Sequence, residues 1–347
     1  MSAYLNTRVS LYAGRLWQDE ELDTLVGVTD DMFIDTLTRR GLQQLVTGYG
    51  SLAGRQQETR SLEQRIIAQH LDETRVLIRP LSGDARTFMT YWTARFEVSN
   101  VKTLLRSKMT GESPAAVLAQ LIPMGIFGRL DNQDLAHAED VGELLRRLEA
   151  GPYAGIVRHA RRAIELSSDP FNLDAALDRG YYEGLVLRAQ PLEDAVGPPF
   201  RTLMANLIDR INLVWLLRYR FNYKLPPAQV YYLLVGSRYS LSGTRLQQLV
   251  ALDSLEAVLA ALPPPWQSRL TGLTDIPGVF ARMEHAAAEQ ALRVLRSNAP
   301  DFSRAFAYLI LRERDLRGVR AVLRGRHLGL ADTHIRQALH RAPAAAT

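Results

Sequence analysis

Three short segments of this sequence carry the same polar pattern, which could bind an anion or an acidic surface. They are EVSNVKTLLRSKMTG from Glu97, DRINLVWLLRYRFNY from Asp209 and DLRGVRAVLRGRHLG from Asp315. Each begins with an acid, has Asn or Gly three residues later, and ends in a basic-x-basic step after an apolar pair. Arginine and lysine donate hydrogen bonds to carboxylates and phosphates. The candidate partner-contact residues are therefore Arg106, Lys108, Arg218, Arg220, Arg324 and Arg326.

Two interpretations of this pattern stay open at the level of sequence. Cations in the last turn of a helix interact favourably with the helix dipole, by about 0.3–1 kcal/mol each. The acids Glu97, Asp209 and Asp315 could likewise form ordinary pairs on the helix surface. The functional interpretation is that three related domains present equivalent basic edges to one acidic partner.

The residue three positions after each acid also needs an explanation. Asn100 and Asn212 stand where a helix is expected, and asparagine is slightly unfavourable there. We expect these residues to pack at a helix crossing or to bond a neighbouring backbone group. Because the third copy has Gly318 at this position, close approach of two helices is the favoured explanation.

The common catalytic and cofactor motifs are missing from the sequence. It contains no cysteine, which excludes disulfides and thiolate sites and fits a reducing compartment. No lysine follows a glycine, so there is no Walker A loop. No two of the seven histidines are four residues apart, and Glu-x-x-His does not occur. We therefore expect a non-enzymatic protein with no cofactor and no metal.

Composition adds broad limits on location and partners. The 347 residues have a net charge of +5 and are 47% hydrophobic, as in ordinary globular domains. This charge permits an acidic partner but does not require nucleic acid. The N-terminal residues lack the apolar core of a signal peptide. No apolar run approaches the roughly 20 residues that span a bilayer. We expect a cytoplasmic protein that is at most peripheral to a membrane.

The elements that position the polar pattern are predicted to be helices. Apolar residues recur at steps of three and four through 93–109 and 306–323, which is the helical period. Gly111 is expected to end the first of these helices, and Ser113 to cap the next one, which opens on Pro114. We expect no substantial sheet.

A second block repeats with nearly the same spacing as the acids. Residues 121–148 align with 232–259, and a fainter copy begins near Gly14. The markers keep the same order in each copy, which predicts triplication of a unit of ordinary domain size. The expected helical domains are residues 1–117, 118–229 and 230–340, followed by a frayed tail at 341–347.

Taken together, these blocks resemble the C subunit of V/A-type rotary ATPases, which is called the d subunit in eukaryotic V-ATPases. The resemblance covers nearly the whole chain and includes YLNTRVSLYAGRL at the start and LDRGYYEGL in the middle. Its best part is FAYLILRERDLRGVRAVLRGRHLGL, although Gly318-Val319 replaces the usual Asn-Leu pair. The matching positions there are Tyr308, Arg312, Glu313, Asp315, Arg320, Leu323, Gly325 and Arg326.

The resemblance implies an all-α funnel of three similar domains in a pseudo-threefold arrangement. It implies a non-catalytic central-stalk subunit that couples the rotating axle to the membrane rotor ring during ATP-linked ion transport, with the proton as the expected ion. Its partners would be the axle subunits and the rotor ring.

Three rival interpretations make different predictions. A helical scaffold unrelated to rotary ATPases would have no fixed partnership with a membrane ring. An enzyme using dispersed carboxylates would need a deep polar pocket around acids such as Glu63 or Asp174. A nucleic-acid binder is supported only by the calculated pI near 9.5.

Overall fold

The computed structural model describes residues 2–47, 55–166 and 170–340, and this part of the chain is helical with no strand. The predicted all-α class is therefore confirmed. The expected frayed tail at 341–347 lies outside the described residues. The six longest helices are α5 (Arg55–Ile78), α6 (Gly83–Thr110), α11 (Pro170–Val196), α12 (Pro198–Leu217), α17 (Ile276–Arg296) and α18 (Asp301–His327).

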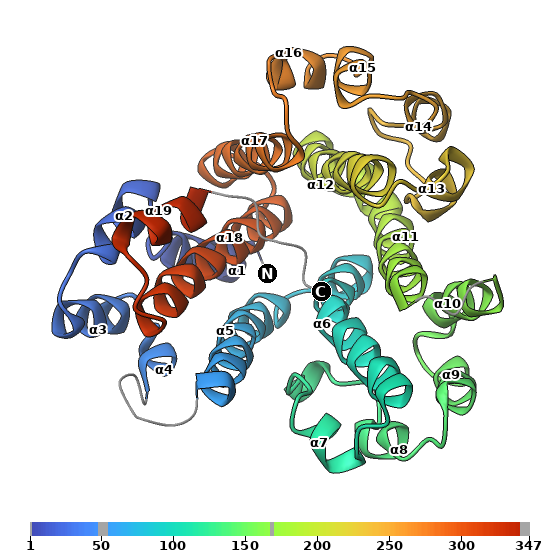
Figure 1. The fold of residues 1–347 in the computed structure, drawn as a ribbon. Coiled ribbons are helices and arrows are strands. Elements are labelled where there is room, and N and C mark those ends of the chain that lie inside the picture. Colours follow the sequence, from blue (N-terminus) through green and yellow to red (C-terminus); the bar gives the residue numbers. More distant parts are fainter. Residues whose placement is uncertain (1, 48–54, 167–169, 341–347) are drawn as a thin grey trace.

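These six helices form a closed ring in which each one packs on the next in chain order. α5 packs on α6, α6 on α11, α11 on α12, α12 on α17 and α17 on α18. α18 then packs back on α5, which joins the C-terminal part of the chain to the N-terminal part. Figure 1 looks into this ring.

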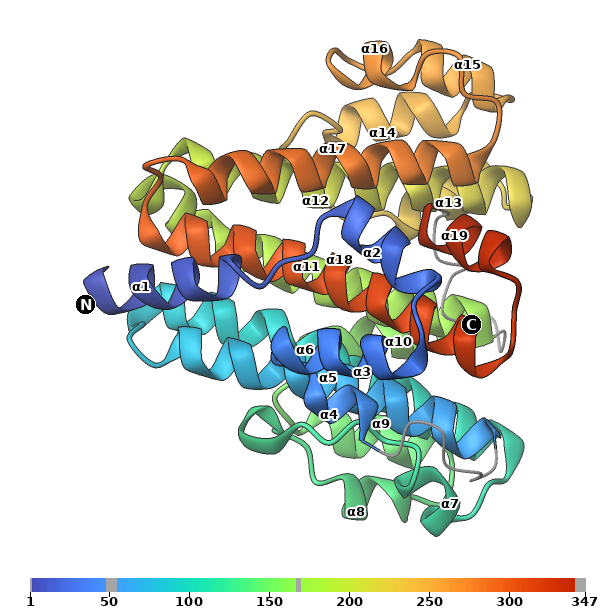
Figure 2. The ribbon, with the colours of Figure 1, turned by 90° about the vertical axis from the view of Figure 1, so that its left-hand side faces the viewer.

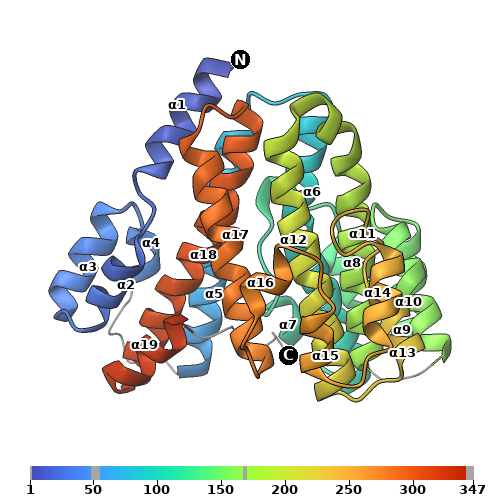
Figure 3. The same cartoon turned by 90° about the horizontal axis from the view of Figure 1, so that it is seen from above.

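Short helices form three groups around the ring. The first group precedes α5 and is joined by the last helix, the second lies between α6 and α11, and the third lies between α12 and α17. Figure 3 shows the turns between paired long helices at one end of the molecule and most of the short helices toward the other end.

The helices of the first group are α1 (Ser2–Ala13), α2 (Asp19–Val26), α3 (Asp30–Arg39), α4 (Gln43–Val46) and the C-terminal α19 (Asp332–His340). The second group comprises α7 (Pro114–Leu118), a 3₁₀ turn at Gly125–Phe127, α8 (Asn132–Ala136), α9 (Val141–Glu149) and α10 (Ala154–Leu166). The third group comprises α13 (Pro227–Leu233), α14 (Gly243–Val250), α15 (Leu255–Ala260) and α16 (Trp266–Leu270), after a π-helical turn at Arg218–Asn222.

Local signals in the sequence set the helix ends as predicted. Gly111 ends α6 with φ of 73°, a left-handed conformation that favours glycine. The hydroxyl of Ser113 accepts a hydrogen bond from the backbone N–H of Ala116 at the start of α7. The domain borders expected at 117/118 and 229/230 fall within α7 and α13.

Three phenylalanines join the ring at its centre. Phe88 of α6, Phe200 of α12 and Phe306 of α18 are fully buried. The ring centroid of Phe88 lies 5.1 Å from those of both Phe200 and Phe306, and Phe200 lies 5.6 Å from Phe306. These distances and the steep interplanar angles of 60–84° are typical of favourable aromatic pairs. We call these three residues the phenylalanine triad.

The triad residues have the same spacing as the three acids. Phe88, Phe200 and Phe306 each stand nine residues before Glu97, Asp209 and Asp315, respectively. The three helices that carry the repeated polar segments therefore meet at the same position relative to the acid. Nothing in the local sequence pattern marks that position as central.

Farther along the same helices the centre of the ring is charged. Arg95 pairs with Glu313 at 2.9 Å, joining α6 to α18. Glu284 of α17 lies 2.5 Å from Arg317 and 3.9 Å from Arg210 of α12. Such paired charges tolerate partial burial because each has an opposite partner. The phenylalanine triad thus gives way to a layer of ion pairs toward the C-terminal ends of α6, α12 and α18.

We predict that Phe88→Ala, Phe200→Ala and Phe306→Ala each lower the free energy of unfolding by about 3–5 kcal/mol, because each leaves a cavity against the other two rings. Urea denaturation followed by circular dichroism measures this loss. Phe200→Leu, which fills most of the space, is the control and should lose less than Phe200→Ala. A loss confined to one of the three alanine variants would contradict equivalent roles.

Candidate functional site

The acid that opens the first polar segment is buried and binds backbone. Oε1 of Glu97 accepts hydrogen bonds from the backbone N–H groups of Arg129 at 2.7 Å and Leu130 at 2.9 Å. Its Oε2 accepts a hydrogen bond from the hydroxyl of Tyr153. The interpretation of this acid as a helix-surface pair is therefore wrong. A carboxylate with three donors holds the segment before α8 against α6.

The other two acids act in the same way. Oδ1 of Asp209 accepts from the backbone N–H of Leu241 at 3.0 Å, and Oδ2 lies 3.3 Å from the indole nitrogen of Trp266. Oδ2 of Asp315 accepts from the backbone N–H of Trp17 at 3.0 Å. Leu130 and Leu241 are the positions that the second repeat aligned, so the equivalence extends to the partners.

The asparagines bond backbone groups. The amide of Asn100 exchanges two hydrogen bonds with the backbone of Ile122, at 2.9 and 2.8 Å. Asn212 does the same with Val235, at 3.0 and 2.9 Å. Backbone bonding was one of the two expectations, and close helix approach, the favoured one, is wrong for both asparagines.

Close approach holds only at the glycine of the third copy. A Cβ on Gly318 would lie 2.8 Å from Cδ1 of Leu22 in α2, a separation too short for carbon atoms. The third copy therefore replaces a side-chain bridge with direct helix contact.

The second basic residue of each step donates to carbonyl groups at the end of a short helix. Nζ of Lys108 lies 2.6 Å from the carbonyl oxygen of Ala136, the last residue of α8. Nε of Arg220 lies 2.8 Å from that of Val250, the last residue of α14. Nη1 of Arg326 lies 3.0 Å from that of Val26, the last residue of α2. The last carbonyls of a helix lack partners within it, so a cation there satisfies them.

We call each set of acid, third residue and second basic residue a clamp. In every copy the second basic residue stands eleven positions after the acid (97 to 108, 209 to 220 and 315 to 326). Eleven residues make about three helical turns, so both groups lie on one face of the long helix. Each clamp therefore grips a short helical segment at two points.

Each clamp joins a long helix to a later short helix, except the third, which returns to the start of the chain. α6 holds α8, α12 holds α14, and α18 holds α2 from the opposite end of the sequence. Figure 2 shows α2 beside α18 and α19, which pack on one another. The third clamp thus closes the molecule between its two ends.

A family model described as ATP synthase (C/AC39) subunit matches residues 5–338, which include all three clamps and the phenylalanine triad. The chain belongs to that family. The resemblance inferred from the sequence blocks is therefore confirmed.

Its relatives in archaea and bacteria are distant. The C subunit of the A-type ATP synthase of Methanocaldococcus jannaschii is 25% identical over 75% of this chain, and the match spans 64% of that protein. The corresponding A-type protein of Haloquadratum walsbyi is 24% identical over 96% of both chains. The C subunit of the V-type ATP synthase of Thermus thermophilus is 26% identical over 79% of this chain and 78% of its own.

In this family member, four of the six candidate partner-contact residues have internal roles. Lys108, Arg220 and Arg326 belong to the clamps, and Arg106 forms an ion pair with Asp174 of α11. Arg324 is exposed and Arg218 is half-buried; for the side chains of these two, the described part of the chain provides no hydrogen bond or ion pair. Four of the six basic residues therefore bond to other parts of the molecule, whereas the side chains of the remaining two make no such bond within its described part.

A buried ion pair also closes the ring, and its acidic member was not predicted from the sequence. Arg312 of α18 donates to both carboxylate oxygens of Glu73 of α5, at 2.9 and 2.8 Å. The hydroxyl of Tyr308 adds a third hydrogen bond at 2.6 Å. Burial opposes ionisation, but the charge and hydrogen bonds of Arg312 hold the pKa of Glu73 below its usual value. Removing either partner would leave an uncompensated buried charge.

The acids considered for catalysis are ion-paired. Glu63 lies 3.5 Å from Arg320, and Asp174 pairs with Arg106. Glu284, which recurs at the same place in the third unit, pairs with Arg317 at 2.5 Å. Because each of the three acids is paired with an arginine, an architectural role is favoured over an active site. Among the described helices, none has the length and hydropathy required to cross a membrane.

The third clamp is the least satisfied of the three. Asp315 has one backbone donor, the N–H of Trp17. Its carboxylate also lies 3.7 Å from the guanidinium group of Arg312. The buried indole nitrogen of Trp17 has no hydrogen-bond partner in the described residues, unlike that of Trp266 in the second clamp. Burial raises the pKa of Asp315 to about 7, against the opposing effects of the Trp17 N–H and Arg312. The contact between α18 and α2 therefore contains a carboxyl group, that of Asp315, whose ionisation is unfavourable.

The two members of one basic step provide a matched test. We predict that Arg220→Met lowers the free energy of unfolding by about 1–3 kcal/mol, because it leaves the carbonyls of Val250, Leu252 and Leu225 without their donor. Arg218→Met should change it by less than about 0.5 kcal/mol. Urea denaturation measures both values. Equal losses in the two variants would show that the clamp residue has no special role.

We predict that Asp315→Asn changes the pH dependence of stability. With the folded pKa near 7 and the unfolded pKa near 4, the folded wild type binds an extra proton between these values, so its stability falls as pH rises from 4 to 7. The free energy of unfolding of Asp315→Asn relative to wild type should rise by about 2–3 kcal/mol between pH 5 and pH 8.

Denaturation at several pH values tests this prediction, with the exposed Asp332→Asn as control. The difference between Asp332→Asn and wild type should stay flat over the same range. A flat difference for Asp315→Asn as well would contradict the raised pKa.

Proposed function

We propose that this protein is a non-catalytic central-stalk subunit of an A/V-type ATP synthase. In this role it couples the rotating axle to the membrane rotor ring during ATP-linked ion transport, with the proton as the proposed ion. Support comes from the family match over residues 5–338 and from relatives named as the C subunits of A-type and V-type ATP synthases. The proposed location is the cytoplasmic side of the membrane, peripheral to it within the complex.

We further propose three similar domains, residues 1–117, 118–229 and 230–340, in a pseudo-threefold funnel. The phenylalanine triad and the three clamps support it, because the same positions of three helices make equivalent contacts. With these borders, the long helix of each domain grips the next domain, and the third grips the first. Such head-to-tail contacts close when three units complete a turn.

A closed set of contacts among three domains suits a subunit that transmits torque. A coupling that deforms would store rotation elastically, so its units must resist sliding past one another. Directional bonds at both ends of each clamp oppose such sliding, and the acid at one end is buried. Moving a buried carboxylate away from its donors leaves unpaired polar groups. The clamps are therefore the feature that best supports a mechanical role.

Arg218 and Arg324 are the proposed contacts to the axle or the ring. They occupy the same position in the second and third polar segments, and neither side chain has a hydrogen bond or an ion pair within the described part of the molecule. Charge reversal at these two sites leaves the clamps intact, whereas reversal at all six basic residues would damage the fold as well.

We predict that the wild-type protein, affinity-purified from native membranes, retains the axle and rotor-ring polypeptides at fixed stoichiometry. The double variant Arg218→Glu/Arg324→Glu should retain roughly tenfold less of one of them, because each reversal replaces attraction to an acidic partner with repulsion. Arg245→Glu, an exposed position on α14, is the matched control. Absence of both polypeptides from the wild-type preparation would refute the proposed function, and full retention by the double variant would refute only these contacts.

A further inference from the structure

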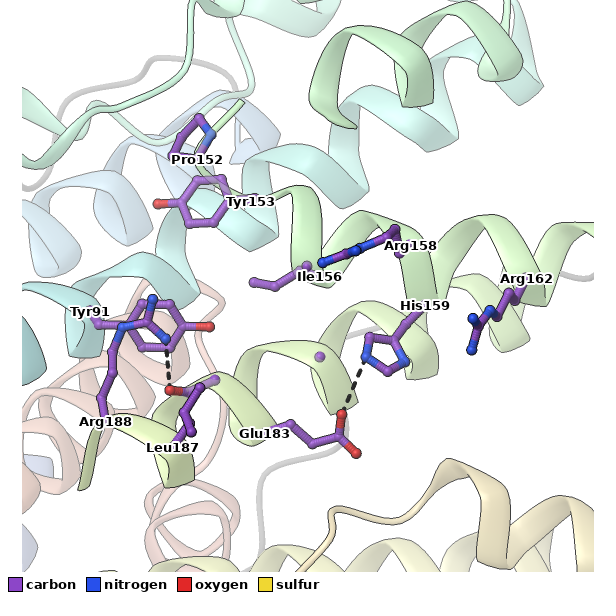
Figure 4. Close-up of a pocket in the computed structure, with 13 residues that line it drawn as sticks. Tyr91, Pro152, Tyr153, Ile156, Arg158, His159, Arg162, Glu183, Leu187 and Arg188 are labelled. Atoms are coloured by element: carbon purple, nitrogen blue, oxygen red, sulfur yellow. Dashed lines mark hydrogen bonds and ion pairs between the residues drawn. The ribbon is translucent and has the colours of Figure 1, made fainter. Parts of the chain in front are cut away.

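A cavity of about 480 Å³ opens between α10 and α11, with Tyr91 of α6 at its floor. Figure 4 shows the side chains that line it. The lining shares one residue with the hydrogen bonds of the clamps, Tyr153, whose hydroxyl is committed to Glu97. The family assignment does not explain why the fold leaves this space open.

Glycines keep the cavity open on both sides. A Cβ on Gly155 of α10 would meet no atom within 4 Å, so this residue faces open space. A Cβ on Gly184 of α11 would lie only 2.1 Å from the hydroxyl of Tyr91. Any side chain at Gly184 would therefore displace the tyrosine that forms the floor.

The lining is strongly cationic. Arg158 and Arg162 extend from α10, Arg188 extends from α11, and His159 lies half-buried between them. The one carboxylate in the lining is Glu183. Its carboxylate already accepts a hydrogen bond from Nε of Arg179 at 2.8 Å and lies 3.3 Å from Nε2 of His159.

Arg188 is fixed in place before any ligand arrives. Its guanidinium carbon lies 3.9 Å from the ring centroid of Tyr91, and its Nη1 donates to the carbonyl of Gly184 at 2.9 Å. Stacking on an aromatic ring and one backbone bond hold the planar group, while most of its five N–H donors stay uncommitted. Preorganised donors of this kind lose little conformational entropy on binding.

Arg158 and Arg162 are the complementary, unfixed donors. For both side chains, the described residues supply no ion pair and no hydrogen bond. Two guanidinium groups on one helix, with a third at the other end of the cavity beside Tyr91, suit an extended group with several negatively charged oxygens better than a single carboxylate.

We propose that this cavity binds a phosphate-bearing anion, with Arg158, Arg162 and Arg188 donating to its oxygens. The ligand is either a soluble polyphosphate-type compound or the phosphate headgroup of a lipid. This site does not depend on the proposed function, since it uses neither the clamps nor Arg218 and Arg324.

His159 provides an internal reporter of occupancy. Burial lowers its pKa, Glu183 acts in the opposite direction, and Arg179, Arg162 and Arg158 lower it further. An anion bound among these arginines would offset their effect, so the pKa of His159 should rise when the site fills.

The first test titrates the full chain with inorganic tripolyphosphate at physiological ionic strength, where contacts between exposed charges are weakened. Calorimetry should show one equivalent bound, and Arg158→Gln/Arg162→Gln should weaken binding by about tenfold or more. Arg86→Gln/Arg245→Gln removes the same charge at two exposed positions elsewhere and should change the affinity less than about twofold. Equal weakening by both pairs would indicate diffuse attraction to a basic protein and overturn the site.

The second test identifies the source of the phosphate. Co-sedimentation with phosphatidylcholine vesicles that contain phosphatidic acid, but not with pure phosphatidylcholine, would assign a lipid headgroup. Tripolyphosphate binding without co-sedimentation would assign a soluble ligand. Nuclear magnetic resonance of the His159 ring should show an upward pKa change with whichever ligand binds. If neither ligand binds, or if the pKa of His159 does not move when one binds, the proposal is wrong.

Discussion

The phenylalanine triad is the constraint on which the arrangement of the long helices depends. Each ring is fully buried and lies against the other two, so the contact requires all three helices. Bringing three side chains from α6, α12 and α18 together fixes the spacing of the three helical pairs. The surrounding ring of contacts, including the buried pair of Glu73 and Arg312, follows from that convergence.

The clamps fix the positions of the short helices through polar contacts, as the phenylalanine triad fixes the long helices through apolar ones. Burying a carboxylate is unfavourable unless donors surround it, and Glu97 and Asp209 obtain those donors from backbone and side-chain groups of a segment distant in sequence. A basic residue three turns later satisfies the far end of the same short helix. Each long helix therefore specifies which segment docks on it, and where along its length, with few residues.

Sequence reasoning reached the helical class, the helix ends at Gly111 and Ser113, the repeated segments and the family. Those features depend on local periodicity and on similarity between segments. It offered backbone bonding of Asn100 only as the less favoured of two alternatives, and it did not find that Lys108 caps a different helix. Periodicity identifies a buried face without identifying what lies against it. The phenylalanine triad was within reach, since its members share the spacing of the three acids.

The third clamp has a consequence for how the protein is made. The backbone N–H of Trp17 and the carboxylate of Asp315 are 298 residues apart, so α2 leaves the ribosome long before α18 exists. Until synthesis is nearly finished, the apolar faces of α2 and α3 have no final partner and need shielding by other means. A nascent chain that stops before α18 can complete the other two clamps but never this one, so correct docking of the earliest helices reports that translation reached the last long helix.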